Sequence, residues 1–235
     1  MNKLPYSSHV ALEGQLRNKK AAKIVTIISE YINLTECKVL DIGTGSGHIA
    51  NGIAQKAREV HSVNISDERV IAEGYHFQIV NSETLPFLNE SFDVVVSNHV
   101  IEHLPNHQLH LSEIYRVLKP NGLLYLATPN KYALMEPHFR LPFLSWLPRK
   151  WANSYTQRFR KKEWDIYPLT RNYIRKLTND NFTIDWWSLR IVKDLQKFQI
   201  NAHPIIRGVF DYLPMSVLKL TAPIIPTFVG VLKKK

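Results

Sequence analysis

The amino-acid sequence predicts an α/β fold in which helices cover both faces of a mostly parallel sheet. Two patterns in the 235 residues predict it. Short apolar runs alternate with segments whose apolar residues recur at helical spacing, as in parallel strands joined by crossover helices. A glycine-rich turn follows the first apolar run, at the edge where such sheets bind ligands. The length suits one domain, 1–235, and 45% apolar residues can fill a sizeable core.

The first half of the chain supplies most of the sheet. Five short runs rich in Val, Ile and Leu are expected to be buried strands: 38–42, 60–64, 77–80, 92–97 and 123–128. Three intervening segments are expected to be helices: 46–57, about 67–73 and near 108–118. The sequence Lys119-Pro-Asn-Gly122 should end the last of these helices and turn the chain into the fifth strand.

After Thr128 the alternation breaks. Residues 129–168 are rich in proline, aromatic residues and arginine, and we expect a lid insertion that overhangs the carboxyl edge of the sheet. Thr170 is a suitable N-cap for a helix through Leu177. Three further elements follow by pattern: a sixth strand at 182–192, an apolar helical insertion at 196–224 and a final short strand at 227–232.

Composition bounds the location of the protein and its partners. The single cysteine, Cys37, excludes an intramolecular disulfide, and no apolar run approaches the roughly 20 residues needed to cross a bilayer. The N-terminus lacks the apolar core of a signal peptide, so we expect a cytoplasmic protein, with attachment to the inner face of a membrane as an option. The formal charge of +10 is concentrated at 131–176, where eleven Lys and Arg face three acids among several aromatic residues. That segment is either a solvated face over a small aromatic core or a surface for an anionic partner.

The glycine-rich turn is the strongest local motif. A strand delivers Asp41, and the chain then passes through Gly43, Gly45 and Gly47 into a helix. Glycines allow close approach of a ligand to the backbone and positive φ angles. The G-x-G-x-G spacing behind an aspartate differs from the form of this turn that binds a pyrophosphate.

Four blocks together resemble the class I S-adenosylmethionine-dependent methyltransferases, specifically the group called methyltransferase type 11. They are 39–50, 83–96, 98–104 and 113–130. The resemblance implies a Rossmann-like sheet of seven strands with the last one antiparallel, and S-adenosylmethionine as cofactor. It implies that Asp41, Gly43 and Gly45 surround the methionine end of the cofactor. The full set expected to bind it is Asp41, Gly43, Thr44, Gly45, Asn64, Asn81, Ser82 and Asn98.

Two positions depart from the family pattern. Asn64 stands where an acid usually holds the ribose hydroxyls, and Asn81 replaces an acid near the adenine. An amide oxygen still accepts a hydrogen bond but loses the charge-assisted strength. Weaker cofactor affinity is one interpretation, and a non-catalytic cofactor-binding or scaffold protein is another.

Catalytic candidates follow the fourth predicted strand. His99, Glu102 and His103 share one side of a helical turn, and His138 in the lid is a further candidate. Three roles fit these residues: a structural anchor for the loop, a general base at His99 or His103, or a divalent-metal site that includes His138. We assign no metal ligand among them. Within the lid, Glu136, His138 and Arg140 either tie it to the domain or recognise the acceptor.

The function predicted from these patterns is O-methylation of a lipid-linked, glycan or quinone-type acceptor, with an anionic membrane surface as an additional partner. An RNA methyltransferase is the alternative enzyme, since a basic surface with aromatic residues suits single-stranded nucleic acid. No recognisable RNA-binding module supports that alternative. The sequence does not indicate the oligomeric state.

Overall fold

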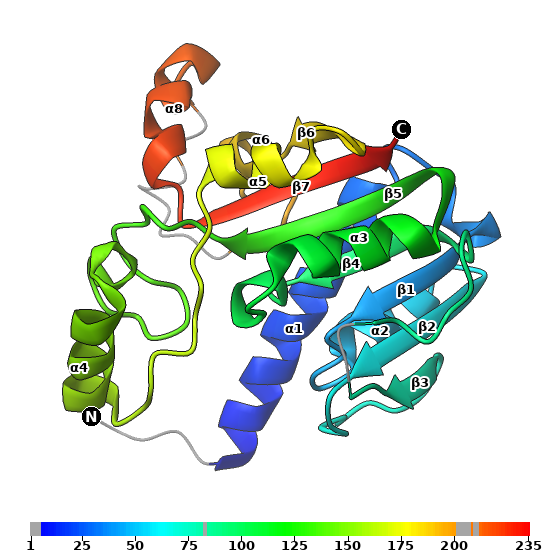
Figure 1. The fold of residues 1–235 in the computed structure, drawn as a ribbon, viewed down its shortest axis with the longest axis horizontal. Helices are drawn as coiled ribbons and strands as arrows, with labels where there is room; N and C mark the ends of the chain where they lie inside the picture. The colour runs from blue at the N-terminus through cyan, green and yellow to red at the C-terminus, as the bar shows by residue number, and fades with distance from the viewer. Residues whose placement is uncertain (1–5, 82–83, 201–207, 209–211) are drawn as a thin grey trace.

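A seven-stranded sheet forms the centre of the computed structural model, which describes residues 6–81, 84–200, 208 and 212–235. Its strand order is β3-β2-β1-β4-β5-β7-β6 (Figure 1). The strands are β1 Lys38–Ile42, β2 Glu59–Asn64, β3 His76–Ile79, β4 Phe92–Asn98, β5 Leu118–Pro129, β6 Phe182–Trp186 and β7 Thr227–Lys234. β1 to β5 pair in parallel, whereas β7 is antiparallel to both β5 and β6. The predicted fold class, with its antiparallel last strand, is confirmed.

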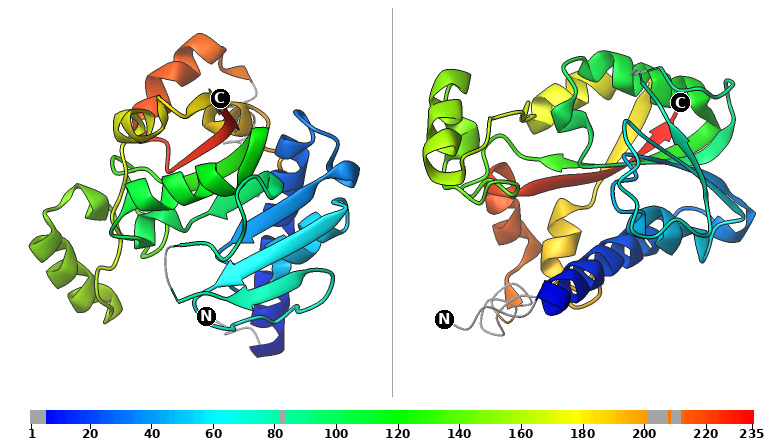
Figure 2. Two further views of the ribbon diagram at one scale, coloured as in Figure 1. Left: turned by 45° about the vertical axis from the view of Figure 1, so that its right-hand side comes forward. Right: turned by 90° about the horizontal axis from the view of Figure 1, so that it is seen from below.

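Helices cover both faces of this sheet (Figure 2). Those described are α1 Tyr6–Ile28, α2 His48–Ala54, α3 His107–Val117, α4 Arg149–Arg160, α5 Arg171–Thr178, α6 Ser188–Lys193 and α8 Met215–Thr221. Alternate strand residues enter opposite cores, since Val39 packs with α1, α2 and α6 while Leu40 packs with α3 and α5. None of the helices in the described part of the chain is long and apolar enough to cross a membrane.

Two predicted elements are wrong. Residues 67–73 form no helix, because Val70 and Ile71 donate their N–H groups to the carbonyl of Ser46 in the glycine turn. The sixth strand ends at Trp186 rather than at 192, because the Ser188 hydroxyl accepts the N–H of Val229 and the chain turns into α6. Tertiary contacts override the local β-propensity of that segment.

The long helix α1 was not predicted from the sequence. Its buried residues Ile24, Ile27 and Ile28 recur at helical spacing and pack against the sheet. The expected helix at 46–57 is shorter than predicted, since α2 ends at Ala54. The helix after Thr170 is present as α5, and the Thr170 side chain accepts the N–H of Tyr173 as an N-cap.

Two segments project from the carboxyl edge of the sheet (Figure 1). One leaves β5 and contains α4, which packs on a small core of its own: Leu141, Leu144, Ala152, Trp164 and Ile166. The other contains α8 and leads through a short 3-10 helix, Ala222–Ile224, into β7. Residues 201–207 and 209–211 of the predicted helical insertion lie outside the described residues.

Candidate functional site

The glycine turn connects β1 to α2 at the carboxyl edge of the sheet. Gly43 and Gly45 have φ angles of +83° and +49°, which side chains rarely adopt. A Cβ atom at Gly43 would lie 2.5 Å from Cγ2 of Val100, whereas a Cβ atom at Gly45 would meet no atom within 4 Å. The turn is therefore closely packed at Gly43 and borders open space at Gly45.

Asp41, at the end of β1, is a buried carboxylate beside this turn. Only 1% of the residue is exposed, and its Oδ2 accepts a hydrogen bond of 3.0 Å from the Ser62 hydroxyl. Burial raises the pKa of Asp41 to about 7, and the Ser62 hydrogen bond offsets only part of that rise. A positively charged ligand group near this carboxylate would lower its pKa again.

The other predicted cofactor residues lie around the same edge. Thr44 is buried, with its hydroxyl 2.6 Å from that of Ser62. Asn64 ends β2 half-buried and donates from Nδ2 to the carbonyl of Ser66 at 2.9 Å. Asn98 ends β4 half-buried, and Asn81 is exposed after β3. Ser82 falls outside the described residues.

His99 and Glu102 form a hydrogen-bonded pair just past β4. The Nδ1 atom of His99 lies 3.0 Å from Oε1 of Glu102, and the Thr128 hydroxyl donates to Oε2 of the same carboxylate at 3.0 Å. Glu102 is fully buried, whereas His99 is partly exposed. The backbone of His99 is held at φ +60° by its N–H bond to the carbonyl of Ala127. This strained position orients the imidazole on the strand end.

His138 of the lid joins the same group from the other side. Its Nδ1 lies 2.9 Å from Oε1 of Glu136, and its Nε2 lies 3.6 Å from Oε1 of Glu102. Glu136 is also fully buried. The lid is therefore tied to the domain by a histidine placed between two buried carboxylates.

The pKa values of the two histidines move in opposite directions. Burial lowers the pKa of His99, and the hydrogen bond from its ring to the Glu102 carboxylate offsets only part of that fall. Burial also acts on His138, but the hydrogen bond and charge of Glu136, together with Glu102, outweigh it and raise the pKa of His138. Burial acts to raise the pKa of Glu102. The hydrogen bond and charge of His99 outweigh this effect, so the pKa of Glu102 is lowered. Near neutral pH, His99 is therefore neutral and Glu102 ionised.

His103 lies at the margin of this group. It is exposed, its Nδ1 is 3.7 Å from Oδ2 of Asp165, and its ring meets that of His138 edge to face at 5.5 Å. His99 and His103, which the sequence predicts as alternative general bases, therefore have different surroundings. Of His99 and His103, only His99 has a buried carboxylate at hydrogen-bond distance from its ring.

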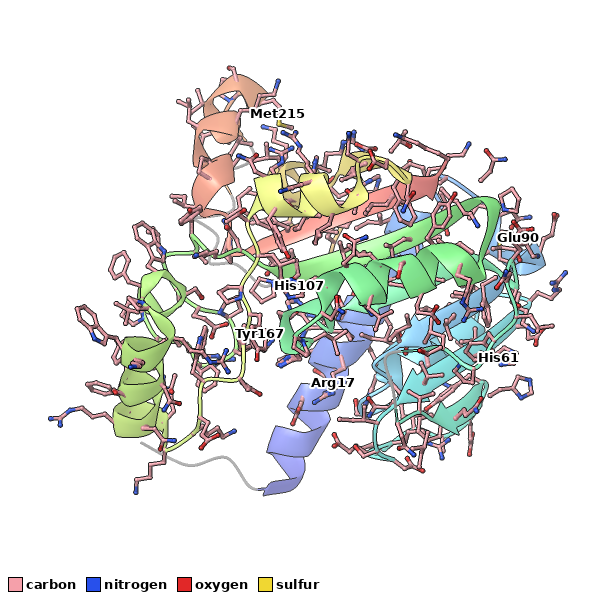
Figure 3. The ribbon with its side chains drawn as sticks, viewed as in Figure 1. Arg17, His61, Glu90, His107, Tyr167 and Met215 are labelled. Carbon is pink, nitrogen blue, oxygen red and sulfur yellow. The ribbon has the colours of Figure 1, made fainter. Side chains whose placement is uncertain are left out.

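A cavity of about 500 Å³ opens at His99. The polar residues that line it are Lys20, Lys23, Asn98, His99, His138, Ser188 and Thr227. The two lysines come from α1, which also reaches the glycine turn, where Arg17 donates to the Ser46 hydroxyl at 2.7 Å (Figure 3). Sequence reasoning missed these α1 residues, since they lie outside every recognised motif. The helical spacing of Ile24, Ile27 and Ile28 was the available signal for the helix that carries them.

Among the described residues, two groups have the ligand spacing for a metal ion. His99, Glu102 and His138 place one ligand atom each within 4.8 Å of one another, and Glu59, His61 and His76 do the same on β2 and β3. In the second group, Lys38 binds the Glu59 carboxylate at 2.9 Å and competes with any cation. The first group adjoins the cavity.

Comparison with known proteins finds a family match for the glycine turn and the strands around it. Residues 40–126 match a family described as a methyltransferase domain. These residues are a methyltransferase domain. A ubiquinone biosynthesis O-methyltransferase of Rhizobium rhizogenes is 28% identical over 159 residues, covering 63% of this chain and 60% of the relative. This chain therefore aligns with somewhat less than two thirds of that relative's length.

Solved structures agree on the fold of the methyltransferase domain. An S-adenosylmethionine-dependent methyltransferase from Mesorhizobium loti superimposes with a TM-score of 0.60 at 12% identity, covering 90% of this chain and 97% of the other. A similar protein from Listeria monocytogenes gives 0.60 at 14%, covering 92% and 98%. The predicted methyltransferase fold is confirmed for the chain, and the predicted family match is confirmed for residues 40–126. Asp41, the glycine turn, Asn98 and the His99–Glu102 pair all lie within the matched residues, whereas His138 lies outside them.

Proposed function

We propose that this chain transfers the methyl group of S-adenosylmethionine to a hydroxyl oxygen of a lipid-linked, glycan or quinone-type acceptor. The observation that carries the proposal is the His99–Glu102 pair, whose histidine lines the cavity. Methyl transfer to oxygen needs alignment and a group that accepts the hydroxyl proton. A neutral imidazole held by a buried carboxylate is suited to that task.

The residues at the glycine turn fit the cofactor. Open space adjoins Gly45. Burial raises the pKa of the Asp41 carboxyl group, and a cationic ligand beside it would stabilise the ionised form. S-adenosylmethionine, when bound, supplies an activated methyl group and carries positive charge. Asp41 and the turn would hold its methionine end, and Asn64 and Asn81 its ribose and adenine ends with neutral amides.

The protein then has to hold the acceptor and take one proton. Glu102 fixes His99 through Nδ1, which leaves Nε2 to accept the proton of the acceptor hydroxyl as its oxygen takes the methyl group. The electron pair of the broken sulfur–carbon bond would stay on the sulfur of the cofactor, which would leave as a neutral thioether. The imidazolium formed is stabilised by the ionised Glu102, and Thr128 keeps that carboxylate in place. His138 positions Glu102 from the lid side and is a positioning residue in this scheme.

Two observations favour an apolar acceptor. The relatives named ubiquinone biosynthesis O-methyltransferases act, by that name, in the synthesis of a quinone. Besides its polar residues, the cavity is lined by aliphatic residues, among them Ile191 and Val192 of α6 and Ile225 of the segment before β7. A quinone precursor or another lipid-linked hydroxyl compound matches both.

An anionic membrane surface fits the outer side of the lid. Trp151 and Phe159 of α4 are 68% and 57% exposed, among basic residues. Leu220 of α8 is 78% exposed, and both helices project from the same edge of the sheet (Figure 1). Apolar and basic groups on one side favour adsorption to an anionic interface.

The proposal is tested in cells that express the wild type, His99→Gln or Glu102→Gln. We expect compounds of the lipid fraction to gain the mass of one CH₂ unit with the wild type, and turnover to fall by roughly 10² or more in both variants. Cofactor affinity, measured by calorimetry on the purified proteins, should stay unchanged. A new mass in the RNA fraction alone would favour the RNA alternative. No new mass in any fraction, with the cofactor bound, would favour a non-catalytic role.

The metal hypothesis gives a different result in the same assay. With His99 as a general base, a chelator leaves the rate unchanged. If chelation abolishes turnover and added Mg²⁺ or Mn²⁺ restores it, His99, Glu102 and His138 hold a metal ion, and the general-base scheme is wrong.

A further inference from the structure

Two lysines of α1 line the cavity, and neither has a carboxylate partner among the described residues. Lys20 and Lys23 are one helical turn apart, so both face the same side of α1. Within the described part of the chain neither ammonium forms an ion pair. The nearest acid on the helix, Glu13, is already bound to Arg17 at 2.6 Å.

The surroundings make these charges costly. Lys23 is half-buried, and burial, helped by the charge of Lys20, lowers the pKa of Lys23 to about 8. Lys20 is more exposed, and its charge reaches His99, whose pKa it helps to lower. Among the described residues that line the cavity there is no Asp or Glu. Unpaired ammonium groups of this kind are stabilised by a bound anion.

Apart from Ser188 and Thr227, the rest of the cavity wall is apolar. Ile191 and Leu195 contribute from α6 and its C-terminal extension, Ile225 from the segment before β7, and Val229 from β7. A ligand that matches this lining needs an acidic group for the lysines and an apolar body for the aliphatic residues. Its hydroxyl group would lie at His99, which lines the same cavity.

We propose that Lys20 and Lys23 form an anion subsite which selects an acceptor bearing a carboxylate or phosphate at one end of an apolar body. This inference rests on the proposed function for its role in catalysis, but the binding it claims does not require turnover. The lysines act as specificity-determining residues, because an uncharged amphiphile of the same length would leave them unpaired.

The test is calorimetric titration of the full chain with octanoate and octyl phosphate, and with 1-octanol as the uncharged match. We expect both anions to bind at least about tenfold more tightly than octanol. The anion that binds more tightly shows whether the subsite prefers a carboxylate or a phosphate group. Lys23→Met and Lys20→Met should each weaken anion binding about tenfold and leave octanol unchanged. Lys23→Arg should retain binding, and Lys56→Met, an exposed lysine after α2, should have no effect.

Three results would overturn the subsite. One is equal binding of octanol and the anions, and a second is no binding of either anion. The third is that the Met variants weaken S-adenosylmethionine binding and leave the anions unaffected, which would assign the lysines to the carboxylate of the cofactor. Thermal unfolding of each variant checks that the fold is retained. Loss of methyl transfer alone would count against the proposed function and not against the subsite.

Discussion

Two histidines share one carboxylate at the site, and their environments separate their protonation states. His99 faces the cavity with one acidic neighbour, Glu102, and with Lys20 and His138 as like charges. His138 lies between Glu102 and Glu136, and Asp165 adds a further negative charge. Opposed pKa shifts of this kind allow two residues of the same type to differ in protonation state, so that one is neutral and able to accept a proton while the other stays charged. The proposed scheme needs His99 in its neutral form, so the shift has the direction that catalysis requires.

Titration of the histidine ring protons by NMR measures these shifts without an acceptor. We expect His99 to titrate below its ordinary value of 6.5 and His138 above it, with signals assigned through His99→Gln and His138→Gln. Because the folded-state pKa of His138 is raised, its contribution to stability is complete below about pH 6.5 and is lost as the pH rises through the folded value. The reverse order of the two midpoints would contradict the proposed roles.

At the scale of elements, the sequence predicted what its local patterns encode. The strand at 38–42 and the glycine turn behind it lie where they were expected, because apolar runs and glycine spacing are local signals. The His99–Glu102 contact follows from three residues of separation and was predictable as a shared side of a turn. The approach of His138 and Glu136 was not, since the lid folds back through contacts that no local pattern records.

Arg160 of the lid has a structural role that the basic residues around it lack. Arg160 donates from Nε to the carbonyl of Phe139 at 2.6 Å and from Nη2 to that of Arg140 at 3.1 Å, so it fastens α4 to the start of the lid. Arg158, Lys161 and Lys162 are exposed on the same segment. A test of membrane adsorption should therefore spare Arg160.

We expect the wild type to sediment with vesicles containing anionic phosphatidylserine, and to be released as ionic strength rises past about 0.15 M. Replacing Arg158, Lys161 and Lys162 together by Gln should weaken adsorption, because each basic residue near the surface contributes about 1 kcal/mol. Vesicles of phosphatidylcholine alone are the control for charge. Wild-type protein that stays in the supernatant at low salt with anionic vesicles would end the membrane proposal.

At the scale of the whole molecule, the proposed ligand-binding edge is assembled from distant parts of the chain. The glycine turn comes from residues 43–47, the proposed catalytic pair from 99 and 102, the lid from beyond 129, and the cavity lysines from α1. The first two lie in the family-matched region and could be predicted from motifs. The lid and α1 lie outside it, so their contributions to the cavity required the fold.

Calorimetric titration with S-adenosylmethionine tests the central claim, a methyltransferase site at the glycine turn. The variant is Gly45→Asn, because asparagine tolerates the left-handed conformation at φ +49° and its side chain would enter the open space. Gly74→Asn, at φ +86° beside α2, is the matched control. We predict binding by the wild type and the control, and at least about tenfold weaker binding, or 1.4 kcal/mol, by Gly45→Asn. Absence of binding by the wild type, or unchanged affinity in Gly45→Asn, would contradict the account.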